Sequence, residues 1–368
     1  MKEANSLIMK KINKKKIFII SGIVLCGLVL SYFGGGLIAT SIVNEKMINK
    51  RGTTIESLKE DIFRYQKVRE DYPLMKEREE YTFNCGKETL QGYLYEVENP
   101  HGIVISAHGI NNLADGNTAQ YQNYFIEQGW DVFSFDMTGC GRSSGKMKTL
   151  FESRKCVQNA VNFVKNNAKL KDLDVCLVGH SWGVYGVLAA SYDVDVKAVC
   201  SFAGYDKASE MMYGFAEMNV SKALIVTKPA LNFSLSLLQG EKAFFSASSV
   251  IKKRPNTNYV LVHGDKDNTV PLKHYSAYSY VQNKEYDNLT KFLLKDIRHN
   301  GPWKTLAAQT YCDEVIIPKL NTLHGQYKNG IPEDVYTSFL SEIDKEKASE
   351  LNYELLDSIN SVFLNSIN

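Results

Sequence analysis

The chain has 368 residues, of which 44% are hydrophobic and 11% aromatic, and its formal net charge is +2. This composition supports a full hydrophobic core and excludes an intrinsically disordered protein. It carries no basic stripe of the kind that binds nucleic acid, so we expect no nucleic-acid partner.

The N-terminal segment differs in composition from the rest of the chain. A cluster of lysines precedes Ile17, and no charged side chain occurs between Ile17 and Val43. A bilayer is crossed by about 20 helical residues, so residues 17–43 are predicted to form an uncleaved transmembrane anchor after a basic tail, residues 1–16. A cleaved signal peptide is the first alternative, although its apolar region is normally shorter. A buried core helix is the second.

The lysines before the apolar run predict which side of the membrane the remainder occupies. Basic residues stay in the cytoplasm, so the tail is expected there and the rest of the chain outside the cell. Lys46, Lys50 and Arg51 on the far side weaken this orientation without reversing it. Six cysteines outside the anchor argue against it, because free thiols are unusual in extracellular proteins. None of the cysteines forms a CxxC pair, so no zinc site is expected.

Residues 44–75 are charged, and apolar residues recur in them at helical spacing. They are predicted to form a stalk or a helix lying against the globular domain, with a first helix integral to that domain as the alternative. The globular domain is assigned to residues 76–368.

From Tyr81 onward the pattern becomes that of strands and helices in alternation. Tyr81–Phe83 and Leu90–Tyr95 flank a turn signal and predict a β-hairpin. Further apolar runs predict strands at Ile103–Ala107, Val132–Phe135, Val175–Val178, Ala198–Phe202, Tyr259–Val262 and Phe292–Leu294. Helical stretches such as Thr118–Gln128 and Glu152–Asn167 separate them. This alternation predicts an α/β fold with a doubly wound, mostly parallel sheet.

Two segments depart from the alternation. The interval between Phe202 and Tyr259 is too long for a plain crossover, and its Met, Phe and Leu residues predict an inserted helical cap at about residues 205–255. The tail from Asp344 to Asn368 is predicted to form one final amphipathic helix.

A candidate nucleophile lies in Gly179-His180-Ser181-Trp182-Gly183, between the strand Val175–Val178 and the helical run Val184–Ser191. A serine in such a strand–turn–helix elbow is held in a strained conformation that lifts its oxygen above the sheet edge. Side chains at the flanking glycines would clash in so tight a turn.

A serine hydroxyl needs a base, and the base needs a group that orients it. His299 follows the strand Phe292–Leu294 and is the candidate base. His263-Gly264-Asp265-Lys266-Asp267 follows the strand Tyr259–Val262, and either Asp265 or Asp267 is a candidate for the acid. All of these lie at the carboxyl ends of strands, the edge where Ser181 is expected.

Two backbone amides are candidates for an oxyanion hole. Ile110 follows His108-Gly109 at the end of the strand Ile103–Ala107, and Trp182 directly follows Ser181. Amides at these two places point toward the oxygen of a substrate carbonyl that Ser181 attacks.

Together these residues resemble the α/β-hydrolase superfamily, and within it the bacterial serine hydrolases related to monoacylglycerol lipases and serine aminopeptidases. The resemblance covers Tyr81 to Asn368. It rests on the early hairpin, His108-Gly109, the Asp136–Ser143 loop, the Ser181 elbow and the motif His263–Pro271. It implies that the acid is Asp267 and that the Ile110 amide belongs to the oxyanion hole. Asn300–Trp303 and the segment Lys319–Ile343 depart from the common pattern.

The resemblance implies a serine hydrolase with the triad Ser181, His299 and Asp267 and an acyl-enzyme intermediate. A carboxylic ester is the expected substrate, with a lipid or acyl ester favoured by the apolar cap and the tether. A peptidase or aminopeptidase and an acyltransferase are the alternatives on the same fold. A non-catalytic, membrane-anchored binding module is a further alternative, because fold does not guarantee function. No cofactor and no metal are expected.

Overall fold

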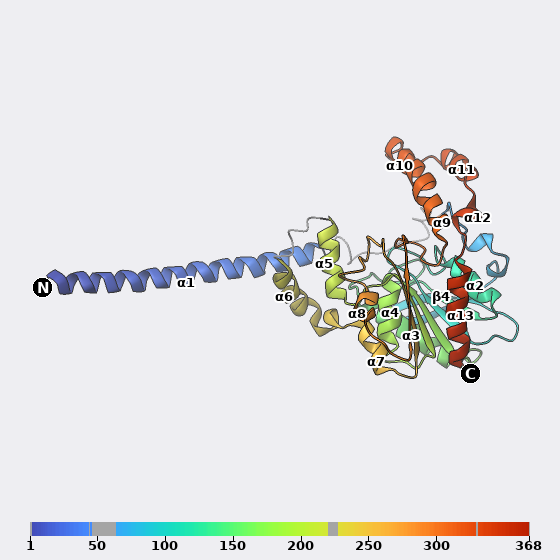
Figure 1. Cartoon of the computed structure of the whole chain (residues 1–368), viewed down its shortest axis with the longest axis horizontal. Helices are drawn as coiled ribbons and strands as arrows, with labels where there is room; N and C mark the ends of the chain where they lie inside the picture. The colour runs from blue at the N-terminus through green and yellow to red at the C-terminus, as the bar shows by residue number, and fades with distance from the viewer. Residues whose placement is uncertain (1, 44, 46–63, 220–226, 329, 368) are drawn as a thin grey trace.

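A single eight-stranded sheet forms the centre of the globular part (Figure 1). The structure is a computed structural model, and it describes residues 2–43, 45, 64–219, 227–328 and 330–367. The strands are β1 (Glu79–Cys85), β2 (Glu88–Tyr95), β3 (Ile103–Ala107), β4 (Asp131–Phe135), β5 (Val175–His180), β6 (Ala198–Phe202), β7 (Asn258–Gly264) and β8 (Leu289–Leu294). Their order is β1-β2-β4-β3-β5-β6-β7-β8. β2 pairs antiparallel with β1 and β4, and all the other pairs are parallel. The predicted mostly parallel sheet is therefore confirmed.

The register of the central strands brings the candidate loops together. Every residue of β3, β4, β5 and β6 is buried, as expected for strands covered on both faces. Ala107 at the end of β3 is opposite Gly179, and His180 is opposite Phe202. The segments that follow β3 and β5 therefore leave the sheet side by side, at its carboxyl edge.

Helices cover both faces of the sheet. α3 (Glu152–Asn166) and α4 (Trp182–Ala190) pack on one face, and α2 (Ala119–Glu127) and α13 (Tyr353–Ile367) on the other. The rings of Phe125 and Phe363 stack at 5.4 Å and join α2 to α13. A doubly wound fold follows from these two buried layers.

The interval between β6 and β7, where the sequence predicts a cap, contains helices. α5 (Ala208–Asn219) and α6 (Lys228–Gln239) come first, and short 3₁₀ turns and α7 (Val250–Lys253) return the chain to β7. α8 (Ala277–Val281) lies between β7 and β8.

The region after β8 forms a projection with its own small core. α9 (Leu306–Tyr311), a π-helical turn (Cys312–Ile316), α10 (Ile317–Gln326) and α11 (Glu333–Ser341) make it up, and Ile316, Leu320 and Phe339 are buried in it. Figure 1 shows α10 and α11 standing away from the sheet.

The predicted single C-terminal helix is wrong in one respect. α12 (Lys345–Ala348) is a separate short helix, and α13 begins only at Tyr353. The break arises because the Ser349 hydroxyl accepts a hydrogen bond from the Lys67 amide, while Leu351 pairs with Lys304. Asn352 then accepts a hydrogen bond from the Leu355 amide at the start of α13.

The N-terminal helix α1 runs from Lys2 to Val43, so it includes the predicted basic tail as well as the apolar run. Its segment Phe18–Ile42 is long and apolar enough to cross a membrane. Residues 44 and 46–63 of the predicted stalk lie outside the described residues. Residues 64–75 form two 3₁₀ turns, Arg69–Asp71 and Pro73–Met75, that pack against the globular part through Tyr65, Tyr72 and Met75.

Candidate active site

Ser181 occupies the strained turn between β5 and α4. Its backbone has φ 54° and ψ −112°, a region that residues with a side chain rarely adopt. The flanking glycines make the turn possible. A Cβ on Gly179 would lie 2.7 Å from the Gly183 carbonyl, and a Cβ on Gly183 would lie 2.0 Å from the oxygen of Ala107. Any side chain at either position would force these backbones apart.

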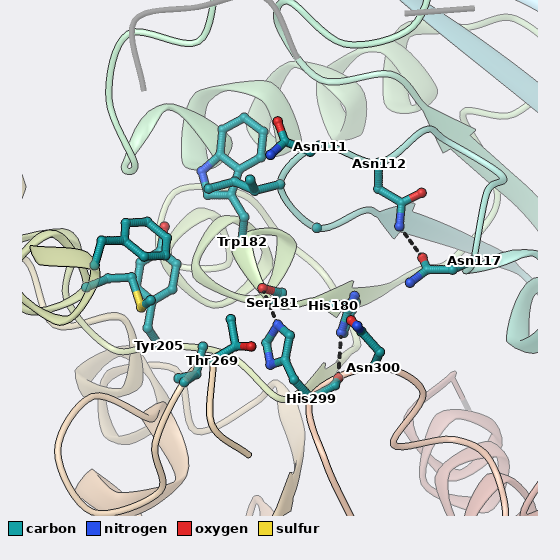
Figure 2. A pocket seen from close by; sticks show the side chains of 15 residues that line it. Asn111, Asn112, Asn117, His180, Ser181, Trp182, Tyr205, Thr269, His299 and Asn300 are labelled. Atoms are coloured by element: carbon teal, nitrogen blue, oxygen red, sulfur yellow. Dashed lines mark hydrogen bonds between the residues drawn. The ribbon is translucent and has the colours of Figure 1, made fainter. Parts of the chain in front are cut away.

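The loops after β7 and β8 bring an acid and a base to this serine. His299 Nε2 lies 2.9 Å from Ser181 Oγ, and His299 Nδ1 lies 2.8 Å from Asp267 Oδ2 (Figure 2 shows the first contact). Asp267 Oδ1 accepts hydrogen bonds from the amides of Thr269 and Val270 at 2.9 and 2.8 Å. These amides fix the carboxylate, so its second oxygen is directed at the imidazole.

The structure distinguishes between the two candidate aspartates. Asp267 is buried, whereas Asp265 is exposed and its Oδ1 accepts a hydrogen bond from the Asp296 amide at 2.7 Å. Asp265 therefore joins the loops after β7 and β8 at the surface and does not contact His299.

The electrostatics of the buried acid favour its charged form. Burial by itself would raise the pKa of Asp267, but the neighbouring His299 and its hydrogen bond, with His263 beside it, hold that pKa below its usual value. His263 donates its Nε2–H to the Val270 carbonyl at 2.9 Å, and burial lowers the pKa of His263. A charged carboxylate beside a neutral His263 is the arrangement that stabilises an imidazolium at His299.

The candidate oxyanion amides lie on the opposite side of Ser181. Gly109 approaches the elbow so closely that a Cβ on it would lie 3.3 Å from the Cβ of Ser181. Ile110 follows immediately, and both Ile110 and Trp182 line the same cavity as Ser181. Trp182 is the first residue of α4, where a backbone N–H has no acceptor within its helix.

His108 fixes the loop that carries Ile110. Its Nε2 accepts a hydrogen bond from the Met137 amide at 2.9 Å, so Nδ1 carries the proton and donates to the Gly109 carbonyl at 2.7 Å. Burial lowers the pKa of His108 and keeps it neutral, as this pair of bonds requires. The loops after β3 and β4 are thereby joined behind the site.

The candidate residues open into a cavity of about 260 Å³ with two different sides (Figure 2). Met211 and Phe215 of α5, with Val270, give it an apolar side. The opposite side carries side-chain amides, those of Asn111, Asn112, Asn117 and Asn300. Asn300 belongs to the segment that departs from the common pattern, whereas nothing in the local sequence marks Asn111, Asn112 or Asn117 as lining residues.

Within the described residues, no group of three or more His, Cys, Asp or Glu side chains is arranged to hold a metal ion. Each of the seven cysteines is a free thiol, and those outside α1 are buried.

The fold and the sequence comparison agree on the class of protein. Residues 98–230 match the family model described as serine aminopeptidase, S33, a match that covers less than half of the chain and includes β3 to β6 and the elbow. The chain has the α/β-hydrolase fold, and its segment 98–230 is similar to that family. No curated protein sequence matches the chain.

Solved structures of α/β hydrolases are similar to the chain at low identity. The esterase Pf2001 of Pyrococcus furiosus is 15% identical with a TM-score of 0.48, over 70% of this chain and 93% of its own. Est1E of Butyrivibrio proteoclasticus, solved with ferulic acid, is 19% identical with a TM-score of 0.46, over 60% and 90%. The α/β hydrolase GrgF of a Penicillium species is 17% identical with a TM-score of 0.45, over 73% and 98%.

Proposed function

We propose that the chain is a membrane-anchored serine hydrolase that cleaves a carboxylic ester through Ser181, His299 and Asp267. One observation carries the proposal. Two hydrogen bonds link Asp267 Oδ2 to His299 Nδ1 and His299 Nε2 to Ser181 Oγ, and the serine opens into a cavity. A nucleophile, a base and an orienting carboxylate in this geometry are what acyl transfer through a serine requires.

The mechanism follows from the directions of these bonds. Ser181 Oγ attacks the ester carbonyl while His299 Nε2 takes the hydroxyl proton, and Asp267 stabilises the imidazolium. The amides of Ile110 and Trp182 hold the negative oxygen of the tetrahedral intermediate. His299 then gives its proton to the departing alcohol and leaves an acyl-enzyme. Water, deprotonated by His299, then attacks the acyl carbon, the bond to Ser181 Oγ breaks, and His299 returns the proton to Oγ as the carboxylic acid departs.

The cavity lining favours an ester over a peptide with a free amino terminus. An aminopeptidase binds the ammonium group of its substrate through carboxylates. Among the described residues, those that line this cavity include no Asp or Glu. Met211 and Phe215 offer an apolar surface for an acyl chain. Peptide hydrolysis, named by the matched family model, and acyl transfer to an acceptor other than water are the alternatives.

The anchor is the second part of the proposal. Most side chains of α1 between Phe18 and Ile42 are exposed and apolar, which suits a lipid environment. The lysines before them support an orientation with the catalytic domain outside the cytoplasm. Protease treatment of intact cells tests this orientation. Digestion of the domain without lysis is expected, and protection until lysis would contradict the outside assignment. Recovery of a soluble form lacking α1 would support a cleaved signal instead.

The catalytic proposal is tested with p-nitrophenyl esters of about two to sixteen carbons and with a fluorophosphonate probe. The full chain is expected to hydrolyse at least one ester and to be labelled, and Ser181→Ala is expected to lose both properties. Loss of a triad serine lowers kcat by about 10⁶-fold in a comparable enzyme. Labelling without ester hydrolysis would favour the peptidase or the acyltransferase. Neither labelling nor hydrolysis would favour the non-catalytic binding module.

A further inference from the structure

Cap helix α6 packs directly against α1, inside the segment that is long enough to span a membrane. The rings of Phe33 and Phe233 lie 5.0 Å apart at 67°. Next to them the backbones approach so closely that a Cβ on Gly36 would lie 2.6 Å from the Cβ of Ala230. Figure 1 shows the start of α6 beside the end of α1 nearest the globular part. The cap and the candidate anchor therefore share an interface.

The residues of this interface are those that pack helices in lipid. Both helices place small residues four positions apart, Gly36 and Thr40 on α1 and Ala230 and Ser234 on α6. Both hydroxyls are buried, and each donates at 2.8 Å to a carbonyl of its own helix, Thr40 to Gly36 and Ser234 to Ala230. Small residues that bring two helices close together, with hydroxyls satisfied internally, are typical of membrane helix pairs.

The depth of the contact places part of α6 below the membrane surface. The span Phe18–Ile42 has 25 residues, which is about 37 Å of helix at about 1.5 Å per residue. This exceeds a hydrocarbon layer of about 30 Å by about 7 Å. Phe33 precedes Ile42 by about 14 Å along the axis. Even if the whole excess lies on the outer side, Phe33 remains about 7 Å inside the hydrocarbon.

The outward face of α6 suits that environment. Phe233, Leu237 and Leu238 are 45%, 61% and 54% exposed. No charged residue occurs between Lys228 and Glu241, and the exposed face of α6 combines these three apolar side chains with the uncharged Ser236. An uncharged helix face with large exposed apolar side chains suits contact with the acyl chains of a bilayer.

We propose that α6 inserts into the outer leaflet beside α1, with Phe233, Leu237 and Leu238 against the acyl chains. The inference rests on the proposed anchor. α6 contacts α5, the helix that supplies Met211 and Phe215 to the catalytic cavity. Insertion of α6 therefore holds the cavity at the membrane surface, where its ester substrate is a lipid of the bilayer.

Depth-dependent quenching of tryptophan fluorescence tests the insertion in the full chain, reconstituted in phosphatidylcholine vesicles with brominated acyl chains. The three native tryptophans are buried and give a constant background. Leu237→Trp is the reporter. Leu28→Trp, 63% exposed on α1, is the control for spanning, and Tyr353→Trp, 54% exposed on α13, is the control for water. We expect the fluorescence of the introduced tryptophan to be quenched mostly by bromine atoms placed near the headgroups. We also expect it to be shielded from acrylamide in the water.

The outcomes separate the inference from its premises. A reporter quenched by acrylamide as strongly as Tyr353→Trp would overturn the insertion while the Leu28 control still reports a spanning α1. A reporter shielded from both quenchers would overturn it in favour of a protein partner or a second copy of the chain. An unquenched Leu28 control would overturn both the anchor and the insertion, and the ester assay of Ser181 would remain an independent test of catalysis.

Two glycine variants test whether the contact with α1 holds α6 in the leaflet. Gly36→Leu pushes against Ala230, whereas at the neighbouring Gly35 no described atom outside its own stretch of α1 lies within 4 Å of the Cβ position. In the Leu237→Trp background, Gly36→Leu is expected to reduce bromine quenching and Gly35→Leu to leave it unchanged. Equal quenching in the two variants would contradict a role for the contact.

Discussion

His180 Nε2 lies 3.1 Å from the backbone carbonyl oxygen of His299, so the residue before the candidate nucleophile holds the backbone of the candidate base. The two rings lie 5.1 Å apart, and Figure 2 shows this bond beside the contact between Ser181 and His299. Because the carbonyl accepts, Nε2 must carry the proton of a neutral imidazole. Nδ1 of His180 is buried and has no hydrogen-bond partner among the described residues. A second proton there would have no acceptor.

This arrangement predicts that acid destabilises the protein through His180. Burial, followed by the nearby His299, lowers the pKa of His180 to about 3, against about 6.5 in an unfolded chain. Between these values the unfolded state binds a proton that the folded state does not, so the free energy of unfolding falls as the pH falls below about 6.5. The wild type should lose free energy of unfolding between pH 7 and pH 5. We expect that loss to be smaller by about 2 kcal/mol in His180→Gln.

Chemical denaturation of the full chain in detergent at both pH values measures this effect. His324→Gln, on the exposed surface of α10, makes the same chemical change without burial and is expected to follow the wild type. If His180→Gln lost as much free energy of unfolding between pH 7 and pH 5 as the wild type, His180 would not be the source of the acid sensitivity.

The choice of Asp267 over Asp265 gives a second prediction. Asp267→Asn keeps the shape of the side chain but favours the wrong tautomer of His299, and a comparable substitution lowers kcat by about 10⁴-fold. Asp265→Asn is the matched control, because the Asp265 side chain is exposed and accepts its hydrogen bond from the Asp296 amide at the surface. We expect it to retain nearly full ester hydrolysis. Similar losses in the two variants would argue against a specific role for Asp267.

The motifs of this chain are predictable from sequence because each is local. Ser181 lies between an apolar strand and a helix that adjoin it in the chain, and His299 and Asp267 each follow a strand by a few residues. In a parallel sheet the ends of such strands meet at one edge, so the three side chains are expected near one another without knowledge of their contacts.

The contacts that join distant segments were not predictable in this way. The bond from His180 to His299 joins residues 119 positions apart, and the contact between α1 and α6 joins an anchor to a cap. Neither contact leaves a periodic signal in the sequence, because each partner satisfies its own local pattern.

The bounds of strand β8 were also not fully predictable from the sequence. Only Phe292–Leu294 was expected, and the half-buried residues that extend it to Leu289 include polar ones.

The elbow glycines give a third prediction, on stability and activity together. A Cβ on Gly183 would meet the backbone of Ala107 at 2.0 Å, so Gly183→Ala must displace β3 or the elbow. We expect a loss of about 1–3 kcal/mol in the free energy of unfolding. We also expect kcat to fall by about 10²–10³-fold, because the amide of Trp182, the candidate oxyanion donor, moves with the turn.

Denaturation and ester hydrolysis check this prediction against Gly325→Ala. Gly325 lies in α10, and no described atom outside its own stretch of helix lies within 4 Å of its Cβ position. Alanine is favoured there because it lowers the conformational entropy of the unfolded chain, so this variant is expected to be at least as stable as the wild type. Normal activity in Gly183→Ala would mean that the elbow is looser than its contacts imply.

The apolar side of the cavity gives the last prediction, on chain length. Met211 and Met212 are adjacent on α5 and equally buried, but only Met211 is among the residues that line the cavity beside Ser181. Met211→Ala deepens the cavity and is expected to shift the optimum of kcat/KM toward longer acyl chains. Each additional methylene that the enlarged cavity buries contributes about 0.8 kcal/mol, or about fourfold in kcat/KM.

Met212→Ala is the control. It is expected to lose about 2–5 kcal/mol of stability through its own cavity and to keep the wild-type chain-length optimum. Profiles over the p-nitrophenyl ester series decide between these outcomes. If both variants shift equally, α5 changes the cavity through its overall packing, and if neither shifts, the acyl chain binds elsewhere.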